Sequence, residues 1–257
     1  NAQFASGKYG SFRGAAAIIG AAELAKYGAE LEPLLVACKA ASPHYRGIRV
    51  NAAHDPVLTK GNFHPSAGML LEAKFREGFG LLEKHGLVCD IWLFSCALGD
   101  LHDLALAFPK TTIVLNHIGT PLAALGSVEN APEYEGKQPN IMSAWREHMA
   151  KIAKECPNIF VKVGGCAIPY LGHGLAERAK PASSSEVAAL FKELYLWTIK
   201  TFGASRCMFE SNFPVDKVSM SYTVLWNAYK RMTKDAGFSE HDRACLFSGT
   251  AKQVYQL

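Results

Sequence analysis

Six short apolar runs recur along the chain, and a stretch with helical periodicity follows each of them. The runs span residues 15–20, 47–53, 88–94, 112–117, 159–165 and 207–211. Their apolar positions are nearly continuous, which is typical of strands buried on both faces of a parallel sheet. Strands that alternate with helices predict an α/β fold, and both a closed (β/α)8 barrel and an open doubly wound sheet satisfy this pattern.

Capping signals mark several of the intervening helices. Ser183, with Glu186 three residues later, forms a capping-box sequence before a long amphipathic stretch. Ser239, with Asp242 at the same spacing, predicts the start of the last helix. A further helix is expected over residues 141–156, where a following proline turns the chain out of helix.

One long stretch, residues 121–140, has no helical or strand pattern. It follows directly from the run that carries His117, and loops of that length in compact domains are usually functional or mobile. No glycine-rich phosphate-binding motif follows any of the predicted strands, which disfavours a nucleotide-binding sheet.

Composition narrows the class of protein further. The 257 residues are 49% hydrophobic, enough for a sizeable core, and we expect a single domain over residues 1–257. The net charge of +4 is too small to indicate a nucleic-acid partner. The longest apolar stretch, residues 14–25, is too short to cross a membrane. Seven dispersed cysteines without a C-x-x-C pair predict a reduced, cytoplasmic protein.

Polar side chains gather where the predicted strands end. These residues are Arg49, Asn51, His54, Asp55, Asn116, His117, Lys162, Glu210, Ser211, Asn212 and Asp216. In both barrels and open α/β sheets, the carboxyl ends of the strands carry the ligand-binding site. This edge of the sheet is therefore the predicted functional site.

Each of these residues also has a structural interpretation. His117 could be a core histidine bonded to a carbonyl, and Lys162 either an edge residue or an inward-pointing charge. Glu210, with Asn212 and Asp216 beside it, could simply satisfy the amides of a turn, and Arg49 alone could be structural. His173, between two glycines in a loop, fits either role.

Local catalytic motifs are absent from the sequence. It contains no H-x-H, H-x-x-x-H or C-x-x-C metal spacing and no G-x-S-x-G nucleophile turn. Any metal ligands would have to come from different strands, which spacing alone does not reveal.

Four segments, "RGIRVNAAHD", "FPKTTIVLNHIGTPL", "NIFVKVGGCAIP" and "RCMFESNFPVDK", resemble the amidohydrolase-related TIM-barrel hydrolases. The similarity extends over nearly the whole chain and points to the branch that includes sugar and dicarboxylate lactonases. It implies a (β/α)8 barrel with about six of the eight strands present. The strand that carries the family's H-x-H is missing before the matched region, as expected for an N-terminally truncated barrel.

The resemblance also implies a set of site residues. His117 matches the family's histidine after the sixth strand, whereas the usual acid after the eighth strand falls on Asn212. An amide cannot act as a general base, so Glu210 or Asp216 would supply the carboxylate. The implied catalytic residues are His117, Glu210, Asn212 and Asp216. The implied substrate-binding residues are Arg49, Asn51, His54, Lys162 and His173.

The implied function is hydrolysis of a lactone, ester or amide of a small carboxylated or sugar-derived substrate by activated water. A divalent metal, zinc or manganese, is an expected cofactor, with His117 as its candidate ligand. A non-catalytic small-molecule-binding barrel and a decarboxylase remain the alternatives. The predicted partner is a small molecule, with no membrane or nucleic acid, and the sequence leaves the oligomeric state open.

Overall fold

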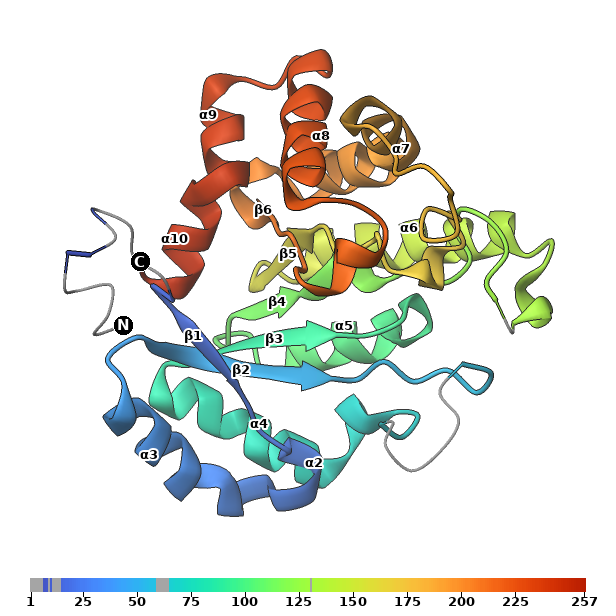
Figure 1. Cartoon of the computed structure of the whole chain (residues 1–257). Coiled ribbons are helices and arrows are strands. Elements are labelled where there is room, and N and C mark those ends of the chain that lie inside the picture. The colour runs from blue at the N-terminus through green and yellow to red at the C-terminus, as the bar shows by residue number, and fades with distance from the viewer. Residues whose placement is uncertain (1–6, 9, 11–14, 59–64, 130) are drawn as a thin grey trace.

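A six-stranded parallel sheet forms the centre of the computed structural model, which describes residues 7–8, 10, 15–58, 65–129 and 131–257. Its strands pair in chain order (Figure 1). They are β1 (Ile18–Ala21), β2 (Tyr45–Asn51), β3 (Val88–Trp92), β4 (Ile113–Leu115), β5 (Ile159–Val163) and β6 (Cys207–Phe209). Each of the six predicted runs overlaps a strand, and consecutive parallel order is the barrel arrangement, with six of the eight strands of a closed (β/α)8 barrel. Within the described residues, β1 and β6 are the edges of the sheet.

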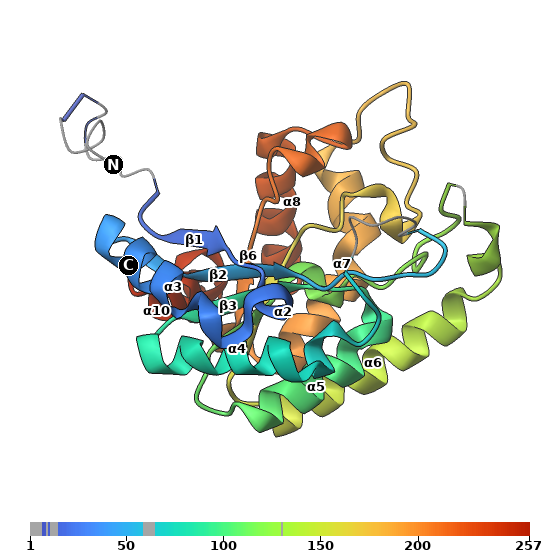
Figure 2. The same ribbon diagram turned by 90° about the horizontal axis from the view of Figure 1, so that it is seen from below.

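Helices pack along the outer side of the sheet, and α4, α5 and α6 follow one another there (Figure 2). The helices are α2 (Leu24–Tyr27), α3 (Glu32–Ala41), α4 (Ala73–His85), α5 (Leu98–Ala107), α6 (Gln138–Glu155), α7 (Ser184–Phe202), α8 (Tyr222–Asp235), α9 (Glu240–Ala244) and α10 (Thr250–Tyr255). None of the described helices combines the length and the apolar character that a membrane crossing requires.

The long stretch predicted to be irregular is shorter than expected. A turn of 3-10 helix occupies Pro132–Tyr134, and α6 begins at Gln138 instead of residue 141. Proline is accepted in the first turn of a helix, where its missing N–H has no partner to lose, so Pro139 extends the helix backwards.

The two faces of the sheet differ in what covers them. Ile91, Leu115 and Val161 belong to the large core beneath the helices. The alternate positions face the inner side, where Val88 and Val114 pack with residues of α10. This packing closes the amino end of the inner face and leaves its carboxyl end to the polar side chains.

The capping box at the start of α7 is confirmed. The Ser183 hydroxyl accepts from the Glu186 backbone N–H, and the Glu186 carboxylate accepts from the Ser183 N–H. Ser239 caps α9 in the same way, because its hydroxyl accepts from the N–H of Asp242.

Removal of the α7 cap is expected to lower the stability of the protein. Ser183→Ala loses one side of the capping box and should cost about 1 kcal/mol of unfolding free energy in urea titrations. Ser185→Ala, at an exposed position in the first turn of the same helix, is the control and should change stability by much less. Equal effects of the two substitutions would contradict this assignment.

Candidate active site

His117 lies in an unusual turn immediately after β4. The chain continues through Asn116–Gly119, where His117 and Ile118 have φ angles of 56° and 49°. Left-handed backbone is rare for a β-branched residue, so surrounding contacts must hold the turn. The buried Trp145 on α6 donates its indole N–H to the Ile118 carbonyl at 2.8 Å. This turn gives the His117 ring its direction.

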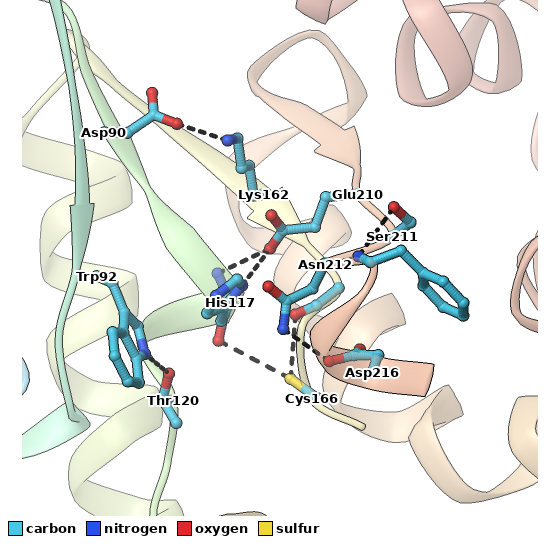
Figure 3. A network of polar contacts seen from close by, with 12 residues as sticks. Asp90, Trp92, His117, Thr120, Lys162, Cys166, Glu210, Ser211, Asn212 and Asp216 are labelled. Atoms are coloured by element: carbon cyan, nitrogen blue, oxygen red, sulfur yellow. Dashed lines mark hydrogen bonds and ion pairs between the residues drawn. The ribbon is translucent and has the colours of Figure 1, made fainter. Parts of the chain in front are cut away.

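The His117 ring binds a carboxylate that follows β6, two strands away in the sheet (Figure 3). Glu210, which follows β6, lies with Oε1 at 2.5 Å from His117 Nδ1, and the same oxygen accepts the His117 backbone N–H at 3.1 Å. The hydroxyl of Tyr229 donates to the Glu210 carbonyl at 2.9 Å and fixes the backbone of the acid. One carboxylate oxygen thus binds the histidine twice.

Two consecutive glycines after β5 make this approach possible. A Cβ on Gly165 would lie 1.9 Å from His117 Nδ1, and a Cβ on Gly164 would lie 2.4 Å from the Glu210 carbonyl oxygen. Gly165 also has a φ of 65°, which glycine adopts without strain. The histidine and the glutamate therefore meet over backbone that carries no side chain.

Arg49 occupies the other side of the ring. Its Nη2 lies 3.3 Å from His117 Nε2. Because the Glu210 carboxylate only accepts, the neutral ring carries its proton on Nδ1, and Nε2 accepts from Arg49. Arg49 and Asn51 are the exposed positions of β2, as their predicted shared face requires, and no carboxylate pairs with Arg49 within the described chain.

Charge and burial act in opposite directions on the two acids of the turn after β6. Burial disfavours the Glu210 carboxylate, but the charge and hydrogen bonds of His117, with the charge of Lys162, lower its pKa to about 2. For Asp216, burial dominates and raises the pKa to about 6, against the hydrogen bond from Asn212 Nδ2 to Asp216 Oδ1 at 2.6 Å. Asp216 is fully buried.

Lys162 points inward and is already paired. Its Nζ lies 2.5 Å from Asp90 Oδ2 on β3, and the Tyr255 hydroxyl donates to Asp90 Oδ1 at 2.9 Å. The structure thus favours the interpretation of Lys162 as an inward-pointing charge. Its ammonium contributes to the field at Glu210 rather than lying free for a substrate.

The contacts of the other expected binding residues are local. His54 Nδ1 lies 2.9 Å from the Pro65 carbonyl, and Asn51 Oδ1 accepts the N–H of residue 53. Both ring nitrogens of His173 bind backbone, since Nδ1 accepts from Leu175 and Nε2 donates to Ile168. Burial lowers the pKa of His173. None of the contacts found in the described chain brings His54 or His173 to His117.

Several residues at the site were absent from the sequence-based set. Trp92 places its ring edge-on to His117 with centroids 6.1 Å apart and donates to Thr120 Oγ1 at 3.1 Å. Asp90 was recognisable as an acid inside an apolar strand, and Gly165 as the second glycine of a pair at a strand end. Trp145 lies on α6, and nothing in the sequence around it indicates its contact with the turn after β4.

A cleft of about 670 Å³ opens beside Arg49. We call it the β1–β2 cleft, because the carboxyl ends of those strands and the helix α2 form its walls. Its lining comprises Ala21, Ala22, Glu23, Leu24, Ala25, Lys26, Tyr27, Leu31, Leu34, Arg49, Val50, Asn51, Pro65, Met69 and Phe75. Arg49 is thus shared between the cleft and the His117 ring.

The donor set around His117 does not fit a divalent metal. A carboxylate on Nδ1 is the usual support of a metal-binding histidine, but here the Arg49 cation lies 3.3 Å from Nε2, the ring atom that would face a metal. No three His, Cys, Asp or Glu side chains in the described part of the chain converge on a common point. His117 as a metal ligand therefore finds no support in these contacts.

The chain belongs to the amidohydrolase family, whose family model matches residues 12–257. An uncharacterized protein, y4mH, from Sinorhizobium fredii is 33% identical over 220 residues, covering 83% of this chain and 62% of that protein. L-fucono-1,5-lactonase from Burkholderia multivorans is 24% identical over 186 residues, covering 72% of this chain and 57% of that enzyme. The chain thus spans about three fifths of the length of these relatives.

Solved structures show the same fold. An amidohydrolase from Burkholderia multivorans superposes with a TM-score of 0.71 at 22% identity, covering 94% of this chain and 74% of that one. A second crystal form of an amidohydrolase from the same organism contains zinc and gives a TM-score of 0.69 with the same identity and coverage. These similarities confirm the barrel-type fold expected from the sequence.

Gly165→Ala tests the close approach of His117 to the backbone. The added methyl group collides with the ring in left-handed backbone, so we expect a loss of about 3 kcal/mol in urea unfolding. Gly237→Ala is the matched control, because Gly237 has a φ of 71° and open space around it. It should lose only the left-handed penalty of about 1 kcal/mol. Similar losses for the two variants would rule out the steric contact.

Asp216→Asn should change how stability depends on pH. The folded pKa of about 6 lies above the ordinary value of 3.8, so the native state binds the proton more tightly than the unfolded chain. The stabilisation is complete at low pH and is lost as pH rises through 6, on the order of 2 kcal/mol. Asp216→Asn should lack this fall in urea titrations from pH 4 to 7.

Asp235→Asn, at the exposed end of α8, should keep the wild-type profile in the same titrations. A wild-type curve that rises over this pH range, or an unchanged curve in Asp216→Asn, would contradict the assignment.

Proposed function

We propose that the protein is a hydrolase that cleaves a lactone, ester or amide bond of a small carboxylated substrate with a water molecule activated by His117. This proposal rests on the contacts that His117 makes with Glu210 at one ring nitrogen and with Arg49 at the other. A largely buried carboxylate orients the imidazole through Nδ1, and Nε2 faces Arg49, which also lines the open cleft. An oriented histidine backed by an acid is the usual arrangement for general base catalysis.

In the proposed reaction, Arg49 leaves Nε2 to bind the carboxylate of the substrate, and a water molecule takes its place at the ring. Nε2 accepts a proton from this water as its oxygen attacks the carbonyl carbon. The Glu210 carboxylate stabilises the resulting imidazolium through Nδ1–H. The ring then returns the proton to the leaving oxygen or nitrogen as the acyl bond breaks, so the histidine ends in its starting form.

Asn212 and Asp216 have a positioning role in this proposal. The Asn212 amide donates to the buried Asp216, and this pair holds the turn that presents Glu210 to the ring. An amide in the position of the family's acid therefore needs no proton transfer of its own. The carboxylate role passes to Glu210, which reaches His117 directly.

The relatives support hydrolysis as the reaction class. The family is that of the amidohydrolases, and one relative is a lactonase for L-fucono-1,5-lactone. No step of this reaction passes through zinc or manganese, because the Arg49 cation lies at Nε2 of His117. We also propose a cytoplasmic location, which is supported by seven free thiols.

His117→Gln should lower kcat/KM by about a thousandfold on lactones that the wild type hydrolyses. Glu210→Gln should lower kcat by a similar factor, because the neutral amide no longer orients or stabilises the imidazolium. His241→Gln and Glu193→Gln, both on the exposed helical surface, are the controls. The assay is a lactone and ester panel with and without chelator.

Retention of activity in His117→Gln would contradict the proposal. Full loss of activity on chelation, restored by zinc, would assign the activation of water to a metal. An absence of turnover, combined with thermal stabilisation by the same compounds, would support the binding-barrel alternative.

A further inference from the structure

Asn116, the residue directly before His117, is buried without a hydrogen-bond partner. It is 0% exposed, and neither Oδ1 nor Nδ2 of its amide has a partner in the described chain. No other buried side chain among the described residues leaves two polar atoms unpaired. Most buried polar groups in folded proteins are paired, and the exceptions include groups that serve catalysis. The amide of Asn116 is therefore available to a ligand.

The backbone directs Asn116 to the inner face of the sheet. Leu115 has extended backbone angles, φ −71° and ψ 115°, and its side chain belongs to the core beneath the helices. The alternation of a strand therefore turns the side chain of the next residue to the opposite face. The register of β4 with its two neighbours places Asn116 between Trp92 on β3 and Lys162 on β5. Asn116 thus lies on the same face as Arg49 and Lys162.

Arg49 extends along the inner face next to this position. Its side chain starts on β2 and its Nη2 reaches His117, which follows β4, so it crosses the inner side of β3. In the proposed reaction, Arg49 leaves the ring for the carboxylate of the substrate. This movement frees space beside the ends of β3 and β4, where Asn116 lies.

We infer that Asn116 is a further catalytic residue, which binds the carbonyl group of the substrate and the attacking water once Arg49 has moved to the carboxylate. This inference rests on the proposed function and adds the group that stabilises its transition state. Asn116 Nδ2 donates to the carbonyl oxygen, and this bond strengthens as the oxygen becomes an anion. Asn116 Oδ1 accepts one hydrogen of the attacking water, while Nε2 of His117 accepts the other.

Both orphaned atoms of the amide thus gain a partner in the reaction. The oxygen of the water forms a bond to the carbonyl carbon, and its proton passes to Nε2 of His117. The negative oxygen of the tetrahedral intermediate then re-forms the carbonyl double bond as the acyl bond breaks. The leaving oxygen or nitrogen takes the proton from His117, and Asn116 is unchanged at the end.

Three other donors near the site already have a partner or a role. Lys162 Nζ binds Asp90 Oδ2 at 2.5 Å, and Asn212 Nδ2 donates to an acid of its own turn at 2.6 Å. Arg49 is the group that binds the carboxylate of the substrate in the proposed function. The developing oxyanion therefore needs a donor beyond these three, and Asn116 supplies one beside the base.

Asn116→Ala separates a catalytic role from a structural one. The substitution removes an amide that has no partner to lose, so the urea midpoint should change little. It should lower kcat by about a hundredfold or more and change KM little, because the bond to the oxygen is made mainly in the transition state. The probe is the γ-lactone of 2-hydroxyglutarate, or the member of the lactone and ester panel that the wild type hydrolyses fastest.

Asn158→Ala is the matched control for stability. Asn158 Nδ2 donates to the carbonyls of Ala105, Phe108 and Thr111 at 3.1 to 3.2 Å, so its loss should lower the urea midpoint and leave kcat unchanged. Asn116→Leu is a second variant, which keeps the branched shape without polar atoms. It should lower kcat at least as much as Asn116→Ala, because no water can take the place of the amide.

The outcomes separate this inference from the proposed function. Unchanged kcat in Asn116→Ala, with activity still lost in His117→Gln, would retain the hydrolase and reject the role of Asn116. A urea midpoint that falls as far in Asn116→Ala as in Asn158→Ala would show that the amide has structural partners, and would also overturn the inference. An absence of turnover by the wild type across the panel would reject both.

Discussion

The hydrogen bond between the buried His117 and the largely buried Glu210 is the constraint on which the rest of the site depends. It joins the ends of β4 and β6 across β5, so the chain between them must allow a ring and a carboxylate to meet over its backbone. The glycine pair, the left-handed turn and the Tyr229 hydroxyl all serve this contact. Removal of one partner from such a pair leaves a buried charge and typically costs about 3–5 kcal/mol.

Two cationic side chains on the inner face of the sheet differ in their partners, because Lys162 pairs with an acid and Arg49 does not within the described residues. Lys162, Asp90 and Tyr255 form a closed network near the helix α10, where no ligand is needed to balance the charge. Arg49 lies toward the cleft, without an acid beside it in the described residues. In the proposed function, the carboxylate of the substrate binds Arg49 from the side of the cleft.

The fold could be predicted from the sequence because parallel strands that are buried on both faces consist of nearly continuous apolar residues. It also placed His117, Glu210 and Arg49 at one edge, since the period of two and the strand ends are visible in the residues. Partners across the sheet were not visible. Lys162 pairs with an acid on β3, two strands away, and the two nitrogens of His173 bind the backbone of its own loop. Left-handed φ angles at His117 and Ile118 likewise have no signature in those residue types.

Glu210 holds the proton of the neutral His117 ring on Nδ1, so that Nε2, which Arg49 contacts, is the nitrogen that accepts. Long-range proton–nitrogen NMR of histidine-labelled protein tests this directly, with His117→Gln to assign the signal. We expect the neutral ring to be protonated at Nδ1 and Glu210→Gln to alter this tautomer balance. A neutral ring protonated at Nε2 in the wild type would contradict the account, because that nitrogen could then no longer accept a proton from water.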